Sequence, residues 1–129
     1  MSLLKVTPVL LVEEIEPCLP FWTDRLAFQV TAEVPHGDRL GFVTLQKDGV
    51  ELMYRTRASA AADVPAVKDN LVAGTSLLYI EVENMGDTLA RLEGADVVVP
   101  LRETSYGAAE VIVREPAGNF IFFAAQSGY

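Results

Sequence analysis

A chain of 129 residues, half of them hydrophobic, is long enough to bury one compact core and too short for several domains. Its net charge of −8 argues against a nucleic-acid-binding protein, because phosphate contacts need a basic face. The single cysteine, Cys18, rules out an internal disulfide and suits a reducing compartment, so we expect a cytoplasmic protein.

No segment predicts membrane insertion or targeting. The apolar run over residues 6–12 is too short to span a bilayer, and Glu13 and Glu14 follow it at once. We therefore expect no membrane partner.

The start of the chain predicts a strand followed by a helix. Residues 5–12 form an apolar run that is typical of a buried strand. We expect a helix over residues 16–26 with Glu16 as its capping residue. Its first turn tolerates Pro17 and Pro20, because the early N–H groups of a helix have no partner within it.

Three further strands complete the first half. Alternation predicts a strand over residues 28–34, and a turn cluster follows at 35–38, where we interpret the only histidine, His36, as a solvated loop residue. Strands over residues 40–47 and 50–55 flank Asp48-Gly49, which is typical of a two-residue hairpin turn.

The second half repeats this order at an offset of about seventy residues. The Ala-rich connector carries a short helix around residues 64–71. The expected elements after it are strands over 76–82, 96–102, 110–115 and 119–125, with a helix over 85–92 after the first strand. We expect an α+β fold of two tandem β-α-β-β-β modules, which form curved mixed sheets around a groove with helices on the outer faces. The single domain, 1–129, comprises module one over 5–57, the connector over 58–75 and module two over 76–126.

Strand parity separates a helix-facing side from a groove-facing side in each hairpin. Pairing around Asp48-Gly49 puts Leu45 opposite Leu52 on the helix side. In the last hairpin, a left-handed Gly118 pairs Glu115 with Asn119. The helix-facing residues there are Val111, Val113, Ile121 and Phe123, and the groove-facing residues are Glu110, Ile112, Arg114, Phe120, Phe122 and Ala124.

Five segments match the order and spacing of a known family. They are V-L-L-V-E-E-I-E-P-C-L-P-F-W (9–22), G-V-E-L-M (49–53), Y-I-E-V-E-N (79–84), Y-G-A-A-E (106–110) and R-E-P-A-G-N-F-I-F-F (114–123). Together they resemble the glyoxalase/bleomycin-resistance/extradiol-dioxygenase family, also called the vicinal oxygen chelate superfamily. The last segment resembles the family's Asp-Pro-Asp-Gly-Asn hairpin, with Glu115 and Ala117 in place of the acidic pair.

The resemblance also implies where a metal would bind. Metalloenzymes of this family place one ligand on each of four strands, commonly His or Gln, Glu, His and Glu. The matching positions here are Thr7, Glu51, Leu77 and Phe122. Only Glu51 keeps a ligand type, because leucine and phenylalanine offer a metal nothing and threonine is a poor ligand. We therefore expect no metal and no other cofactor.

Aromatic and charged residues on the groove-facing sides are the candidate ligand-binding residues. Glu51 either holds a cationic group or pairs with a nearby arginine or glutamine, and the aromatic rings either stack on a planar ligand or form a dimer contact. The Tyr106-Gly107 loop resembles the aromatic-Gly segment that rims the pocket in bleomycin-binding relatives. The candidate set is Phe42, Glu51, Met53, Tyr79, Tyr106, Glu110, Arg114 and Phe122, and we assign no catalytic residue.

The resemblance and the missing ligands favour a metal-free binding protein. It would sequester a planar or cationic amphipathic small molecule, as in antibiotic resistance, in a groove completed by a homodimer. One alternative is a lyase, isomerase or dioxygenase-like enzyme that uses Glu51 or Glu110 as a general base, which requires burial to raise the carboxyl pKa. Another alternative is an interaction module whose groove is closed by packing.

Overall fold

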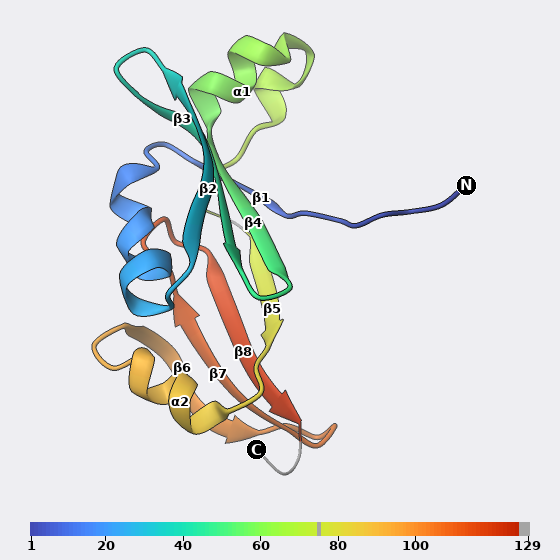
Figure 1. Cartoon of the computed structure of the whole chain (residues 1–129), viewed down its shortest axis with the longest axis vertical. Coiled ribbons are helices and arrows are strands. Elements are labelled where there is room, and N and C mark those ends of the chain that lie inside the picture. Colours follow the sequence, from blue (N-terminus) through green and yellow to red (C-terminus); the bar gives the residue numbers. More distant parts are fainter. Residues whose placement is uncertain (75, 127–129) are drawn as a thin grey trace. The chain divides into compact units, whose positions relative to one another are not determined.

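The computed structural model describes residues 1–74 and 76–126 and divides into two compact units, Met1–Gly74 and Thr75–Tyr129. Each unit contains one four-stranded mixed sheet (Figure 1). The strand orders, β1-β4-β3-β2 and β5-β8-β7-β6, match strand for strand. This agreement confirms the predicted α+β fold of two tandem β-α-β-β-β modules. Thr75, the last position of the predicted connector, lies outside the described residues.

Unit 1 contains the first four strands. Their bounds are β1 Val9–Val12, β2 Gln29–His36, β3 Arg39–Lys47 and β4 Val50–Thr56. β1 runs parallel to β4, whereas β2, β3 and β4 are antiparallel neighbours. The hairpin at Asp48-Gly49 forms as predicted and pairs Leu45 with Leu52. Strand β1 is shorter than the predicted 5–12, although the Pro8 carbonyl still accepts the Met53 N–H at 2.9 Å.

The first helical segment is irregular. It consists of a 3₁₀ helix, η1 (Glu16–Cys18), and a π-helical turn, η2 (Phe21–Arg25). Pro20 has no N–H to donate, so the regular hydrogen-bond ladder is interrupted between the two turns. The prediction that Glu16 caps this segment is wrong. The N-cap is Ile15, and the Glu16 carboxylate instead accepts the Leu40 N–H at 2.8 Å.

This segment covers the sheet of unit 1 through a buried aromatic cluster centred on Trp22. The Trp22 indole Nε1 donates a 2.8 Å hydrogen bond to the Tyr54 hydroxyl, and both residues are 0% exposed. Phe21 and Phe28 pack edge-to-face against the same indole ring. The predicted helix-facing pair of β3 and β4, Leu45 and Leu52, is buried, and so are the residues two positions along on the same side, Val43 and Tyr54.

Two local features of unit 1 differ from prediction. Strand β2 extends through His36, so the turn to β3 comprises only residues 37–38. The connector begins with a helix, α1 (Arg57–Asp63), which contacts β3 and β4 and is N-capped by the Thr56 side chain. A 3₁₀ helix, η3 (Pro65–Asn70), then occupies the place where a short helix was predicted.

Unit 2 follows its predicted elements closely. Their bounds are β5 Leu77–Glu81, α2 Met85–Arg91, β6 Asp96–Glu103, β7 Ala108–Arg114 and β8 Phe120–Gln126. Gly118 has a φ of 98°, and the Glu115 N–H donates to the Asn119 carbonyl, which confirms the predicted hairpin. The buried Glu115 carboxylate also accepts the Asn119 N–H at 2.6 Å. The predicted apolar face is buried and comprises Val111, Val113, Ile121 and Phe123.

Candidate functional site

The predicted ligand-binding residues of unit 1 lie on one face of its sheet. Phe42 of β3 is in register with Arg55 of β4, and Met53 and Glu51 follow on the same side of β4 at two-residue steps. All are partly exposed. Their shared face agrees with the parity argument, because it lies opposite the buried helix-facing set that includes Tyr54.

Glu51 is paired with a residue that sequence reasoning did not connect to it. Lys5, in the segment before β1, donates a 2.7 Å hydrogen bond to Glu51 Oε1, and Thr7 Oγ1 donates to the same oxygen at 3.2 Å. The Lys5 hydrogen bond holds the pKa of Glu51 below its usual range, against a smaller opposing effect of burial. Glu51 is therefore an ionised carboxylate whose partner is an exposed lysine.

In unit 2, the predicted residues form a denser cluster around Glu110 of β7. Arg102 of β6 donates to Glu110 Oε1 at 2.8 Å through Nη2, and Tyr106 donates to Oε2 at 2.7 Å. These two donors lower the pKa of Glu110, although burial alone would raise it. Glu110 is 1% exposed, so an ionised carboxylate is buried with both oxygens occupied.

Aromatic rings lie beside this carboxylate. Tyr79 of β5 is in register with Phe122 of β8, and Phe122 with Ile112 of β7. The Tyr106 hydroxyl interacts with Tyr79 as well as with Glu110, so the 104–107 loop is held over this side of the sheet. Tyr79 is 48% exposed and Tyr106 61%. We call Tyr79, Tyr106, Glu110 and Phe122 the aromatic face of unit 2.

Arg114 lies apart from this group. Its guanidinium is 5.3 Å from the centre of the Phe120 ring and forms a 3.3 Å ion pair with Asp96. The structure therefore connects four of the five residues predicted in this unit and gives Arg114 separate partners.

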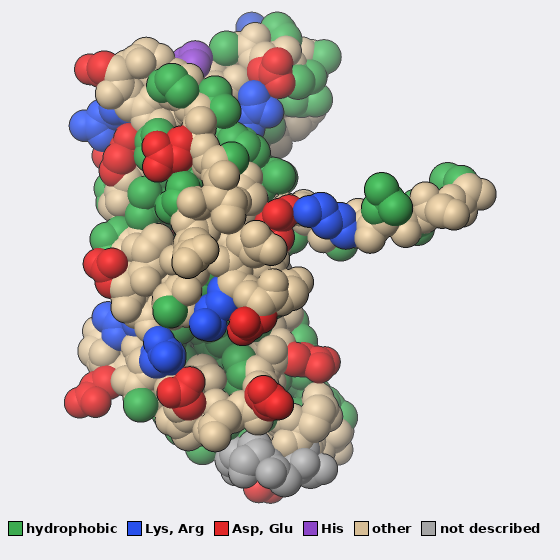
Figure 2. Space-filling view, in the orientation of Figure 1, with side chains coloured by type: hydrophobic (Ala, Val, Ile, Leu, Met, Phe, Trp, Pro, Cys, Tyr) green, Lys and Arg blue, Asp and Glu red, His purple; other side chains and the backbone are tan. Residues whose placement is uncertain are grey.

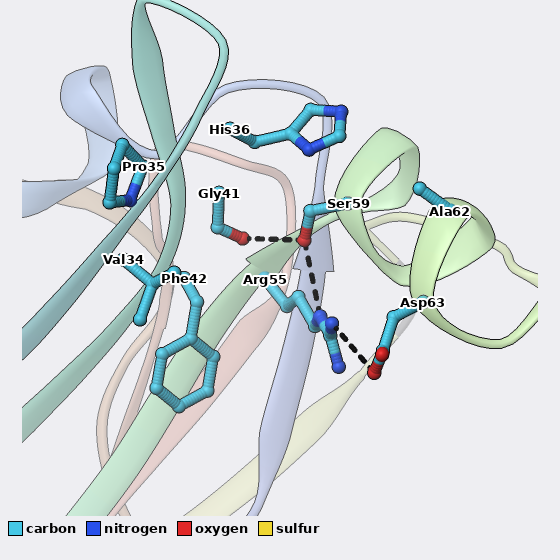
Figure 3. A pocket seen from close by; sticks show the side chains of 9 residues that line it. All are labelled: Val34, Pro35, His36, Gly41, Phe42, Arg55, Ser59, Ala62 and Asp63. Carbon is cyan, nitrogen blue, oxygen red and sulfur yellow. Dashed lines mark hydrogen bonds and ion pairs between the residues drawn. The ribbon is translucent and has the colours of Figure 1, made fainter.

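A hollow that sequence reasoning did not identify lies in unit 1 (Figure 3). Its volume is about 530 Å³, and its walls come from β2, β3, β4 and α1. Its polar side chains are those of His36, Arg55, Ser59 and Asp63, and its apolar wall includes Val34, Pro35 and Phe42. Of the predicted residues, only Phe42 lines it.

Comparison with known proteins identifies the family. Residues 5–123 match the model of the Glyoxalase/Bleomycin resistance protein/Dioxygenase superfamily. The chain belongs to this superfamily. No curated protein matches the chain significantly.

Solved structures of the superfamily share the fold at low sequence identity. A glyoxalase/bleomycin resistance protein/dioxygenase from Nocardioides is 18% identical with a TM-score of 0.72, covering 99% of this chain and 87% of that one. The bleomycin-binding protein of Streptomyces verticillus, complexed with copper(II)-bleomycin, is 23% identical with a TM-score of 0.64, covering 100% and 99%. A lactoylglutathione lyase from Agrobacterium tumefaciens is 14% identical with a TM-score of 0.74, covering 96% and 94%.

The residues at the superfamily's metal-ligand positions do not fit a metal. Thr7 and Glu51 are in contact, but the only strong ligand of the two, Glu51, already pairs with Lys5. The other two positions, Leu77 and Phe122 in unit 2, carry side chains with no ligand atom. Phe122 is in register with Tyr79, and Leu77 with Phe120. Within residues 1–74 and 76–126, no three His, Cys, Asp or Glu side chains are grouped so as to hold an ion.

The distribution of charged side chains on the surface does not help to locate a binding site. Acidic side chains are scattered among basic ones on the face shown in Figure 2. Of the helices that the structure describes, none is long and apolar enough to cross a membrane.

The hollow beside α1 had one signal in the sequence. Thr56 precedes Arg57-Ala58-Ser59-Ala60-Ala61-Ala62, and a threonine before an alanine-rich run is typical of a capped helix. A helix starting there would have placed Ser59 and Asp63 beside the end of β4, where Arg55 lies.

Proposed function

We propose that this protein binds a planar or cationic amphipathic small molecule without a metal and thereby sequesters it. The observation that carries the proposal is the aromatic face of unit 2. Tyr79 and Tyr106 keep about half of their surface exposed beside a buried, ionised Glu110. Exposed rings held by hydrogen bonds offer stacking area at a low entropic cost.

The geometry favours stacking over charge as the main source of ligand binding. Arg102 already neutralises Glu110, so this carboxylate contributes less to the selection of a cation than a free one would. The tyrosine rings attract a cation through their faces. We therefore expect a planar ring system to be the main requirement, with positive charge as a secondary preference.

The general-base alternative fits the carboxylates less well. A base that works near neutral pH needs a raised pKa, whereas the pKa values of Glu51 and Glu110 are both lowered by cationic donors. The oxygens of Glu110 are also occupied by Arg102 and Tyr106. This electrostatic arrangement supports binding over proton transfer.

The similar structures are compatible with both classes of function. One is a bleomycin-binding protein and another a lactoylglutathione lyase, and identities below 25% carry the fold alone. The missing metal ligands at Thr7, Leu77 and Phe122 favour the first of these types.

We further propose a cytoplasmic homodimer. Leu77 and Tyr79 on β5, a strand at the edge of its sheet, are 66% and 48% exposed and lie on the same side of the strand, so a second copy of the chain could cover them together. Sedimentation at micromolar concentration should report twice the 14.0 kDa chain mass. A monomer at that concentration would contradict this part of the proposal.

The binding proposal is tested by thermal shift and calorimetric titration of chelator-treated protein. The probes are a planar aromatic cation, its neutral isostere, an aliphatic cation of equal charge, and bleomycin with and without copper(II). Both aromatic probes should raise the melting temperature, because a ligand of the folded state stabilises it, and the cationic one should do so more.

Tyr106→Ala should weaken both aromatic probes, whereas Arg91→Gln on α2 should leave them unchanged. Saturable binding that appears only after zinc, nickel or iron(II) is restored would contradict the metal-free proposal. If no probe binds Tyr106→Ala more weakly than it binds the unaltered protein, the assignment of the aromatic face as the binding site is wrong.

A further inference from the structure

We propose that the hollow beside α1 is a second ligand site, which takes an aromatic carboxylate and recognises it through Arg55. This site goes beyond the function proposed above, since all its residues belong to unit 1 and none to the aromatic face of unit 2.

The Arg55 guanidinium is fixed from one edge. Its Nε donates to Ser59 Oγ at 3.1 Å, and its Nη2 donates to Asp63 Oδ2 at 3.1 Å (Figure 3). Ser59 Oγ is itself oriented, because it donates to the Gly41 carbonyl at 2.9 Å. The side chain is 29% exposed, so most of the arginine stem is buried and its position is predetermined.

Gly41 is necessary for this arrangement. A Cβ at position 41 would lie 2.6 Å from the Cβ of His36 and 3.0 Å from that of Ser59. A side chain there would force His36 to shift and would crowd Ser59, whose hydroxyl donates to the Gly41 carbonyl. The glycine therefore lets β3 approach α1 closely enough for Ser59 to hold Arg55.

The other edge of the guanidinium contacts no partner among residues 1–74 and 76–126. Within the described residues, Arg55 Nη1 donates no hydrogen bond, and Figure 3 shows it pointing away from Ser59. A guanidinium edge with parallel N–H groups matches the two oxygens of a carboxylate, and such charged hydrogen bonds are stronger than neutral ones. A preoriented donor also costs little entropy when the ligand binds.

The walls of the hollow specify an aromatic ligand. Val34, Phe42 and Arg55 lie in register across β2, β3 and β4, so an apolar wall that includes the partly exposed Phe42 adjoins the guanidinium. Pro35 extends this wall. A volume of about 530 Å³ lies in the range of small-molecule sites. A flat ring can pack against Phe42 while its carboxylate meets Nη1.

Asp63 opposes an anionic ligand but does so weakly. Its side chain is 62% exposed, so solvent screens its charge, whereas Arg55 is mostly buried. The Asp63 carboxylate is also the feature that would favour a cation instead. The experiment must therefore compare an acid, an amide and an amine that share one ring system.

The probes are indole-3-acetate, indole-3-acetamide and tryptamine, titrated calorimetrically into the full chain. Indole-3-acetate should bind about tenfold more tightly than the amide, because only the acid forms a charge-assisted pair with Arg55. Tryptamine should bind no better than the amide. Equal affinities of acid and amide, a preference for the amine, or no saturable binding of the acid at millimolar concentration would overturn the proposal.

Two variants isolate the residues. Arg55→Gln should abolish the preference for the acid, whereas Arg91→Gln removes the same charge from α2 and should leave it intact. Asp63→Asn should strengthen the acid by about two- to fivefold, the scale of an exposed charge pair. This gain cannot arise from loss of folding.

Unchanged or weaker acid binding in Asp63→Asn, or equal losses for acid and amide in Arg55→Gln, would assign Arg55 to structure alone. Loss of acid binding in Tyr106→Ala would instead place the acid on the aromatic face and overturn the separate site.

Discussion

The hydroxyl of Tyr106 donates a 2.7 Å hydrogen bond to Oε2 of Glu110, a carboxylate that is 1% exposed. A half-exposed loop ring is thus attached to a buried charge, with Arg102 on the other oxygen. This contact keeps the ring over its side of the sheet of unit 2 while its face stays accessible. The same contact raises the pKa of Tyr106 and lowers the pKa of Glu110, so titration of either group can test it.

The first prediction is the titration of Tyr106. The hydrogen bond to Glu110 and burial raise its pKa from 10.0 to about 12. A raised folded-state pKa means that the contact stabilises the fold fully below pH 10.0 and that this contribution is lost as the pH rises through about 12. Tyrosinate absorbance should therefore show a late step that is absent in Tyr106→Phe. In Glu110→Gln the step should move toward the ordinary value, and an unmoved step would contradict the assigned cause.

The second prediction is acid sensitivity caused by Glu110. Its folded-state pKa is lowered, first by Arg102 and then by Tyr106, so the stabilisation is present above the usual glutamate range and lost as the pH falls through the folded pKa. Glu110→Gln should lower the free energy of unfolding by about 1–3 kcal/mol at neutral pH. Urea denaturation should show this difference shrinking in acid. The exposed Glu83→Gln serves as the control, and a difference that persists in acid would indicate a packing effect.

Hairpin registers could be predicted because turn residues and strand parity act locally. Asp48-Gly49 and Gly118 each determine where two strands meet, and the pairing of Leu45 with Leu52 and of Ile112 with Phe122 followed. The buried and partly exposed sides of each sheet then followed from the two-residue period.

The contacts that define the candidate sites depend on long-range packing instead. Glu16 accepts a hydrogen bond from the backbone N–H of Leu40, 24 residues away, and so its predicted role as the helix cap was wrong, although the helical segment does begin at Glu16. Glu51 meets Lys5 across 46 residues, in a segment whose strand is shorter than its apolar pattern predicts. The spacing of these residues along the chain does not predict that they are in contact.

The third prediction concerns the core of unit 1. Tyr54→Phe removes the acceptor of the Trp22 indole N–H while keeping the ring, at a site where both residues are 0% exposed. An unsatisfied buried donor should lower the free energy of unfolding by about 1–3 kcal/mol. Denaturation followed by fluorescence of the single tryptophan measures the change. Tyr79→Phe, in a half-exposed ring, should cost less than about 0.5 kcal/mol, and equal losses would contradict the argument.

The last prediction concerns Lys5 and Glu51. Lys5 is mostly exposed and forms the largest contribution to the lowered pKa of Glu51, so it occupies the carboxylate much as a cationic ligand group would. If the face that carries Glu51 binds cations, Lys5→Met should strengthen an aromatic cation by about three- to fivefold, because the internal competitor is removed, and should raise the pKa of Glu51. Glu51→Gln should weaken the same cation and leave its neutral isostere unchanged. Calorimetric titration of the pair into both variants measures these changes, and Arg39→Met, which breaks an exposed ion pair with Glu14, is the control. If Glu51→Gln weakens both ligands equally, the carboxylate only supports the shape of the site and the role of its charge in selection is disproved.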